Sequence, residues 1–107
     1  MDVTGICKDG TLTVHLAGEL DHHAARGAMR EIGRLIDENL PRSCCLELSG
    51  LQFMDSSGIG MMIGRYKFMK RRGGGVRVRG MRQPVERVFR MSGLGQIIKN
   101  EERTESK

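Results

Sequence analysis

Aromatic residues, proline and long apolar runs are all scarce in this chain of 107 residues, which has three Phe, one Tyr, no Trp and two Pro. No apolar run approaches the roughly 20 residues that a membrane-spanning helix needs. The first residues also lack the basic patch and apolar stretch of a signal peptide. These absences argue against a secreted or membrane protein, and we expect a cytoplasmic protein that binds no membrane.

Cysteine is sparse as well, and its spacing excludes the common disulfide and zinc patterns. Cys7, Cys44 and Cys45 are odd in number and include no Cys-x-x-Cys pair. His22 and His23 are adjacent at an expected helix start, where neighbouring side chains point in different directions and make a poor chelate. We therefore expect free buried thiols in a reducing compartment and no metal site.

The remaining composition is typical of one globular domain. Hydrophobic residues make up 38% of the chain and charged residues 29%, a balance found neither in disordered nor in membrane proteins. Eight Met indicate a core filled partly by flexible side chains. We expect a single domain over residues 1–107, in which the polar segment 100–107 is a frayed tail.

Positive charge is concentrated in one segment. The net charge is +5, and residues 67–90 hold nine Lys or Arg but one acidic residue, Glu86. A segment this basic suits a nucleic acid, a membrane surface or an acidic protein, although such runs are usually a solvated face. The segment contains no pair of stacking aromatic residues, because Phe68 and Phe89 are assigned to helices, and this weakens the nucleic-acid alternative.

Strand-like and helical patterns alternate along the chain. Asp9-Gly10 is a favoured hairpin turn, Asp21 is a helix N-cap, and Gly93 is placed to end the last helix. A further turn is expected at Ser49-Gly50. The predicted strands are 3–7, 12–17, 44–48, 76–79 and 97–98, and the predicted helices are 21–39, 57–72 and 84–92.

The resulting order is β-β-α-β-α-β-α-β, which predicts an α/β fold. Its sheet is mixed and mostly parallel, with an antiparallel N-terminal hairpin and three to four helices. The last helix is expected to bury Val85, Val88, Phe89 and Met91.

The helix after Asp55 has two apolar sides. At 100° per residue, the expected core side comprises Ile59, Met62, Ile63, Tyr66 and Met69. The opposite side carries Ser57, Met61, Gly64 and Phe68, with Gly60 beside it. Either the helix is covered on both sides and its glycines permit close packing, or this second stripe is exposed and docks a partner.

Ser57 allows two interpretations. Ser56 or Ser57 could simply be the N-cap of the helix. Alternatively, Ser57 is a switch: a phosphate at a helix N-terminus meets free backbone N–H groups and the positive end of the helix dipole, so the helix would survive the modification.

Four stretches resemble a known family. Phe53-Met54-Asp55-Ser56-Ser57-Gly58-Ile59-Gly60 resembles the phosphorylation motif of STAS domains that antagonise anti-sigma factors. Gly18-Glu19-Leu20-Asp21-His22-His23, Gly64-Arg65-Tyr66-Lys67 and Met91-Ser92-Gly93-Leu94 are similar to the same family in the same order. The resemblance covers residues 3–99, and within the family it is to the antagonists acting on sigma F in sporulation.

The resemblance implies a partner-switching mechanism. The unphosphorylated protein would bind the anti-sigma factor, a serine kinase of the GHKL type, and release the sigma factor. Phosphorylation of Ser57 would inactivate it, and a PP2C-like phosphatase would restore it. The chain itself would be a monomer when free and need no cofactor, since ADP or ATP is held by the kinase. The implied partner-binding residues are Asp21, His22, Asp55, Ser56, Ser57, Gly58, Ile59, Met61, Gly64 and Phe68.

Other functions fit the residues less well. A hydrolase nucleophile would be expected in a Gly-x-Ser-x-Gly turn, but Asp55 occupies the position two before Ser57. Gly58-Ile59-Gly60 lacks the acidic residue that follows a dinucleotide-binding loop. We therefore expect no enzyme. The remaining alternatives are an antagonist in a general-stress sigma factor pathway and, from another class, a basic nucleic-acid-binding domain.

Overall fold

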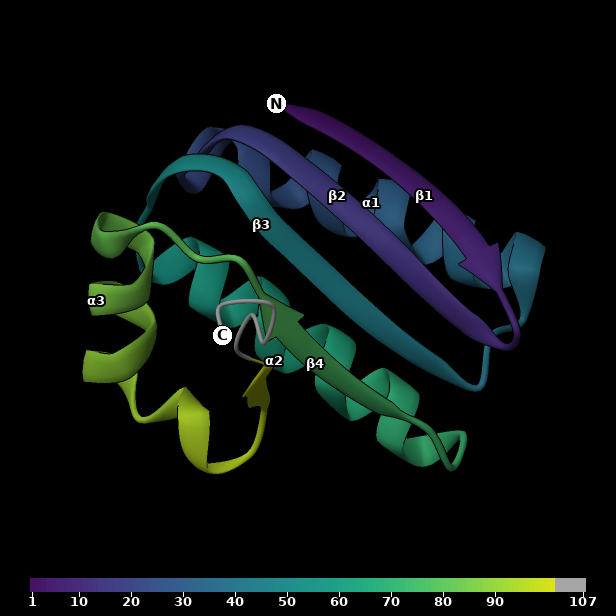
Figure 1. The fold of residues 1–107 in the computed structure, drawn as a ribbon. Coiled ribbons are helices and arrows are strands. Elements are labelled where there is room, and N and C mark those ends of the chain that lie inside the picture. Colours follow the sequence, from purple (N-terminus) through teal and green to yellow (C-terminus); the bar gives the residue numbers. More distant parts are fainter. Residues whose placement is uncertain (102–107) are drawn as a thin grey trace, which may run out of the picture.

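One mixed sheet and the helices that pack against it make up the computed structural model, which describes residues 1–101 (Figure 1). The strands are β1 (Asp2–Lys8), β2 (Thr11–Leu20), β3 (Ser43–Met54), β4 (Gly75–Arg79) and β5 (Lys99–Glu101). The helices are α1 (His22–Asn39), α2 (Ser56–Arg71), α3 (Gln83–Ser92) and the short 3-10 helix η1 (Leu94–Gln96).

Each strand pairs with the next strand in the chain, giving the order β1-β2-β3-β4-β5. β1 and β2 are antiparallel and every other pair is parallel. The predicted α/β fold with an antiparallel N-terminal hairpin is confirmed. The hairpin turns at Asp9 and Gly10, whose φ angles of 53° and 83° are both left-handed, as a tight two-residue turn with the twist of the strands requires.

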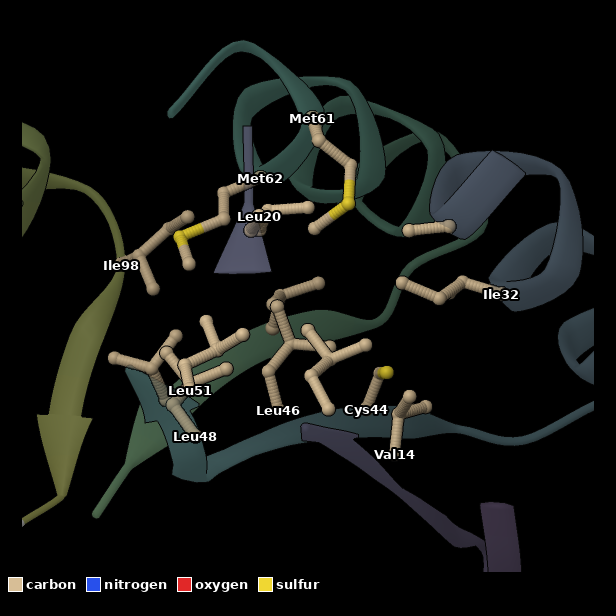
Figure 2. Packing of buried hydrophobic residues seen from close by; sticks show 14 of the residues in the cluster. Val14, Leu20, Ile32, Cys44, Leu46, Leu48, Leu51, Met61, Met62 and Ile98 are labelled. Carbon is tan, nitrogen blue, oxygen red and sulfur yellow. The ribbon is translucent and has the colours of Figure 1, made fainter. Parts of the chain in front are cut away.

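The core lies between the sheet and helices α1 and α2. Alternate residues of β2, β3 and β4 are buried on the face toward the helices, among them Val14, Cys44, Leu46 and Val78. Figure 2 shows Val14, Cys44 and Leu46 pointing toward Ile32 of α1 and toward α2. Strand pairing and helix amphipathicity therefore bury one common apolar layer.

β3 is longer than predicted, because the expected turn at Ser49-Gly50 is wrong. The strand continues to Met54 and absorbs one extra residue between the pairs His15–Glu47 and Ala17–Gly50, and another near Gln52. A Cβ at Gly50 would lie 2.9 Å from the Cβ of Ala17, so the glycine permits close strand approach rather than a turn.

The C-terminal part differs from the prediction in three places. Met91 is exposed rather than buried in α3, while Val85 and Phe89 are buried as expected and Val88 is partly buried. The last strand is Lys99–Glu101 instead of 97–98, and Ile97 is exposed. Asn100 and Glu101 pair with Val78 and Arg79, so this part of the expected frayed tail is in the sheet. Residues 102–107 lie outside the described residues.

Candidate functional site

Two strand-to-helix junctions lie side by side at one edge of the sheet. Leu20 and Met54 are paired at the ends of β2 and β3, and the amide of Asp55 donates a hydrogen bond to the carbonyl oxygen of Leu20 at 3.4 Å. Asp21 and Asp55 follow these two residues and precede α1 and α2. The topology therefore brings together the Asp21 and Ser57 regions that are 36 residues apart in the sequence.

Both junctions are capped by aspartate. The Oδ1 of Asp21 accepts a hydrogen bond from the amide of Ala24 at 2.9 Å, and the Oδ1 of Asp55 accepts one from the amide of Ser57 at 2.8 Å. The prediction that Asp21 caps its helix is confirmed. The interpretation of Ser56 or Ser57 as N-cap is wrong, because Asp55 has the extended backbone and the side-chain bond of the cap.

The first turn of α2 has fewer free amides than the sequence suggested. The amide of Ser57 is bonded to Asp55 Oδ1, and the amide of Gly58 donates to the carbonyl oxygen of Asp55 at 3.0 Å. The Ser57 side chain, by contrast, has no hydrogen-bond partner within residues 1–101. Ser57 is half-buried and Ser56 is exposed. Ser57 thus combines a free hydroxyl with a fixed backbone.

An open cleft of about 540 Å³ lies between the first turns of α1 and α2. α1 contributes most of its wall, and α2 contributes a polar rim at Ser57 and an apolar floor. Three of the lining side chains are basic or imidazole groups and none is a carboxylate. The lining residues are His22, His23, Ala25, Arg26, Met29, Ser57, Gly60 and Met61.

The predicted exposed stripe of α2 is largely wrong. Met61 is only 3% exposed and belongs to the main core, and Figure 2 shows it reaching from α2 into the space above the sheet. A Cβ at Gly64 would lie 2.6 Å from the Cε of Met29, so α1 packs directly over this part of α2. Helix α2 is therefore covered on both sides, as the close-packing alternative stated.

Phe68 does not extend the cleft. It is partly buried, and the guanidinium carbons of Arg65 and Arg72 lie 5.3 and 5.1 Å from its ring centroid. A cation over the face of an aromatic ring is attracted to the ring, so both arginines form stabilising contacts with Phe68. Phe68 is absent from the cleft lining, so the structure does not bring it together with Ser57.

The other expected core residues of α2 are divided. Met62 and Met69 are fully buried, whereas Ile59, Ile63 and Tyr66 are partly buried and pack against the core. Gly58, proposed as a contact residue, is buried against Met54 and Leu20. Of the predicted partner-binding residues, the structure therefore places His22 and Ser57 on the cleft, Asp21, Asp55 and Ser56 beside it, and Met61 at its floor.

Of the α1 residues that line the cleft, sequence reasoning named only His22 as a partner-binding residue. Helical periodicity alone places Arg26 on a solvated face of the helix and Met29 in the core, but both residues line the cleft. His22, Arg26 and Met29 follow one another at helical spacings of four and three residues, which is the signal that could have joined them.

The basic segment is partly neutralised by carboxylates. Arg79 Nε lies 2.6 Å from Glu47 Oε1, Arg77 Nε lies 3.2 Å from Glu101 Oε1, and Arg90 pairs with Glu86. Burial alone would raise the pKa of Glu47, but hydrogen bonds from Arg79 and Ser49 outweigh it and hold that pKa below its ordinary value. These three arginines therefore form ion pairs within the protein itself.

The thiols and the possible metal ligands add no chemistry to the site. Cys44 and Cys45 are fully buried, and burial raises the pKa of the Cys44 thiol to about 12. Within residues 1–101, no three His, Cys, Asp or Glu side chains gather as metal ligands would. In the same part of the chain, no helix is both long and apolar enough to cross a bilayer.

Comparison with known proteins identifies both family and fold. Residues 4–107 match the model of the STAS domain. The chain is 42% identical over 89 residues to the anti-sigma F factor antagonist of Paenibacillus polymyxa, an alignment covering 83% of this chain and 76% of that protein.

Two solved structures show the same fold. The anti-sigma factor antagonist SpoIIAA in its unphosphorylated form is 30% identical with a TM-score of 0.81, covering 97% of this chain and 90% of that chain. The Bacillus cell fate determinant SpoIIAA in the phosphorylated form is 28% identical with a TM-score of 0.72, covering 97% and 93% respectively.

Proposed function

The chain belongs to the STAS domain family, among the anti-sigma factor antagonists, and from this premise we propose that it is a binding protein switched by phosphorylation of Ser57. In its unphosphorylated form it binds an anti-sigma factor that is also a serine kinase of the GHKL type. Binding releases the sigma factor. Phosphorylation of Ser57 ends this binding, and a PP2C-like phosphatase restores it.

The observation that carries the proposal is the free hydroxyl of Ser57 on the rim of the cleft. Because Asp55 caps the helix, the Ser57 hydroxyl is not needed to accept a hydrogen bond from an amide of the first turn of α2. A phosphoryl group added there leaves the cap bond to the Ser57 amide in place. The fold then survives modification while the surface beside the cleft gains a charge of about −1.5 to −2.

The cleft is the surface that this charge alters. Its apolar part comes from Ala25, Met29 and Met61, and its polar rim includes Ser57 and His22. A phosphate at the rim adds charge and a hydration shell where a partner side chain would otherwise enter. Loss of binding is then expected without unfolding.

The chain itself is proposed to be non-catalytic and to need no cofactor. ATP and ADP belong to the partner kinase, which performs the phosphoryl transfer. Sigma F in sporulation is the proposed downstream factor, supported by the 42% identity to an antagonist of that name. Its proposed location is the cytoplasm.

Intact-protein mass spectrometry after incubation with ATP and the anti-sigma kinase of the same genome tests the modification. We expect one phosphate on the wild type and on Ser56→Ala, and none on Ser57→Ala. Ser56→Ala is the matched control because that serine is adjacent and exposed. One phosphate on Ser57→Ala, or none on the wild type with a kinase shown to be active, would contradict the proposal.

Transcription in vitro tests the downstream factor. RNA polymerase with sigma F and the kinase should be silent, and the unphosphorylated protein should restore transcription. A parallel reaction with a general-stress sigma factor and its own kinase is the control. Restoration only in that second reaction would transfer the protein to the general-stress pathway.

A further inference from the structure

We propose that the cleft between α1 and α2 is a receptor for the phosphate on Ser57, with Arg26 as its principal ligand. The inference rests on the proposed phosphorylation of Ser57 and adds how the modified state is held. The phosphate would turn into the cleft and be bound by the protein's own side chains. The cleft would then be occupied from within when the protein is switched off.

The charge of the cleft favours a phosphate. His22, His23 and Arg26 line it, and the eight lining residues include no carboxylate. The acidic residues that most closely precede the lining residues in the two helices are the caps, Asp21 and Asp55. Each cap carboxylate is turned to a helix amide, at 2.9 and 2.8 Å respectively, and neither lines the cleft.

Two backbone amides in the first turn of α2 already have acceptors and are not free to bind a phosphate. The amides of Ser57 and Gly58 already donate to Asp55, at 2.8 and 3.0 Å. A phosphate on Ser57 would have to displace the cap to use the Ser57 amide. Its charge is therefore met by side chains, and the lining supplies them from the neighbouring helix α1.

Arg26 is distinguished from the other arginines of α1 by its surroundings. Arg34 of the same helix pairs with Glu31 and, at 2.6 Å, with Glu38. Within residues 1–101, neither Arg26 nor Arg30 has a carboxylate partner, and of these two only Arg26 lies on the cleft with Ser57. Its guanidinium is a fork of donors that matches two phosphate oxygens at once.

Space for the phosphate is provided at Gly60. A Cβ at Gly58 or Gly64 would collide with Met54 or Met29, so packing accounts for those two glycines. A Cβ at Gly60 would meet nothing within 4 Å, and Gly60 lines the cleft one turn after Ser57. The absence of a side chain there keeps open the volume beside the Ser57 hydroxyl.

The test uses the full chain with phosphoserine placed at position 57 during translation, so that no kinase is required. The second ionisation of the phosphate is followed by ³¹P NMR across pH 4–9. A guanidinium beside the phosphate favours its dianion and lowers its pKa below the ordinary value of about 6. We expect Arg26→Gln to raise that pKa by about half a unit or more.

Arg30→Gln is the matched control. Arg30 is also exposed on α1, one turn further on, and it does not line the cleft. Its substitution removes the same charge as Arg26→Gln does. We expect it to shift the phosphate pKa by less than about 0.2 units, as a screened, more distant charge should. Equal shifts in the two variants, or no shift in Arg26→Gln, would overturn the receptor.

The two proposals fail separately. If phosphoserine 57 shows the Arg26-dependent shift but the kinase never modifies Ser57, the cleft binds phosphate and the proposed switch is wrong. If the kinase modifies Ser57 and Arg26→Gln leaves the phosphate pKa unchanged, the switch remains and the receptor is wrong. Circular dichroism of each variant confirms that the fold is intact.

Discussion

Asp55 Oδ1 accepts a hydrogen bond from the amide of Ser57 at 2.8 Å, so the residue two before the serine, not a serine, caps helix α2. Asp55→Ala should therefore lower the free energy of unfolding by about 1 kcal/mol, the usual cost of losing an N-cap. Urea denaturation measures it. Ser56→Ala should stay within about 0.5 kcal/mol of the wild type, and a larger loss there than at Asp55 would reassign the cap.

Met61→Asp should unfold the protein or destabilise it by more than about 3 kcal/mol, because Met61 is 3% exposed and an unpaired charge in a core is costly. Thermal unfolding followed by circular dichroism gives the answer. Lys67→Asp on the exposed side of the same helix is the control and should melt near the wild-type temperature. A well-folded Met61→Asp protein would indicate that Met61 lies on the surface, as the exposed-stripe interpretation requires.

Gly60→Ala should stabilise the protein by up to about 1 kcal/mol and weaken binding to the anti-sigma kinase. An alanine meets nothing within 4 Å at this position and removes the entropic cost of a helical glycine, yet its methyl group narrows the cleft. Gly27→Ala in α1 also meets nothing within 4 Å and does not line that cleft. The Gly27→Ala variant should be stabilised by the same amount and should bind the kinase as the wild type does. Similar losses of binding in both variants would show that the effect of Gly60→Ala does not arise in the cleft.

Glu47→Gln should remove a pH-dependent part of the stability. The pKa of Glu47 is lowered in the folded protein, so the carboxylate stabilises the fold above its unfolded pKa of about 4.5 and ceases to do so as the pH falls through the folded value. Wild type should exceed the variant by about 1–3 kcal/mol at pH 7, with the gap closing toward pH 3. Urea midpoints at several pH values measure this, and a gap that widens in acid would contradict the Arg79 pairing.

Thiol labelling should separate Cys7 from the other two cysteines. Cys44 and Cys45 are fully buried and burial raises the pKa of both thiols, whereas Cys7 is partly exposed. At pH 7.5 the native protein should react rapidly with one equivalent of a thiol reagent and the unfolded protein with three. Rapid native labelling of Cys7→Ser would show that β3 opens more readily than its burial indicates.

Local patterns were sufficient for most elements and insufficient where two segments meet. The hairpin, the first helix cap and the end of the last helix were predicted correctly. The residue types at these places, Asp9-Gly10, Asp21 and Gly93, favour a turn, an N-cap and a helix end by themselves. Ser49-Gly50 has the composition of a turn, but the neighbouring Ala17 makes it part of a strand. No local signal distinguishes these outcomes.

The candidate site shows the same division. The shared sheet edge of the Ser57 and Asp21 junctions follows from the predicted strand order, because neighbouring parallel strands end together. The burial of Met61 depends on where α1 packs over α2, as it does at Gly64, and helical periodicity within α2 cannot report that position. The position of Arg26 on the cleft likewise depends on how α1 packs beside α2, so it could not be predicted from the sequence of α1 alone.

The sheet order β1-β2-β3-β4-β5 also has a consequence for folding kinetics. Every strand from β2 onward pairs with the strand made just before it, and each parallel pair requires closure across at least one helix. The hairpin β1–β2 can form first and act as a template on which β3 and then β4 are added. During synthesis, the growing chain can therefore acquire its native pairings in order from the ribosome, without waiting for its C-terminal residues.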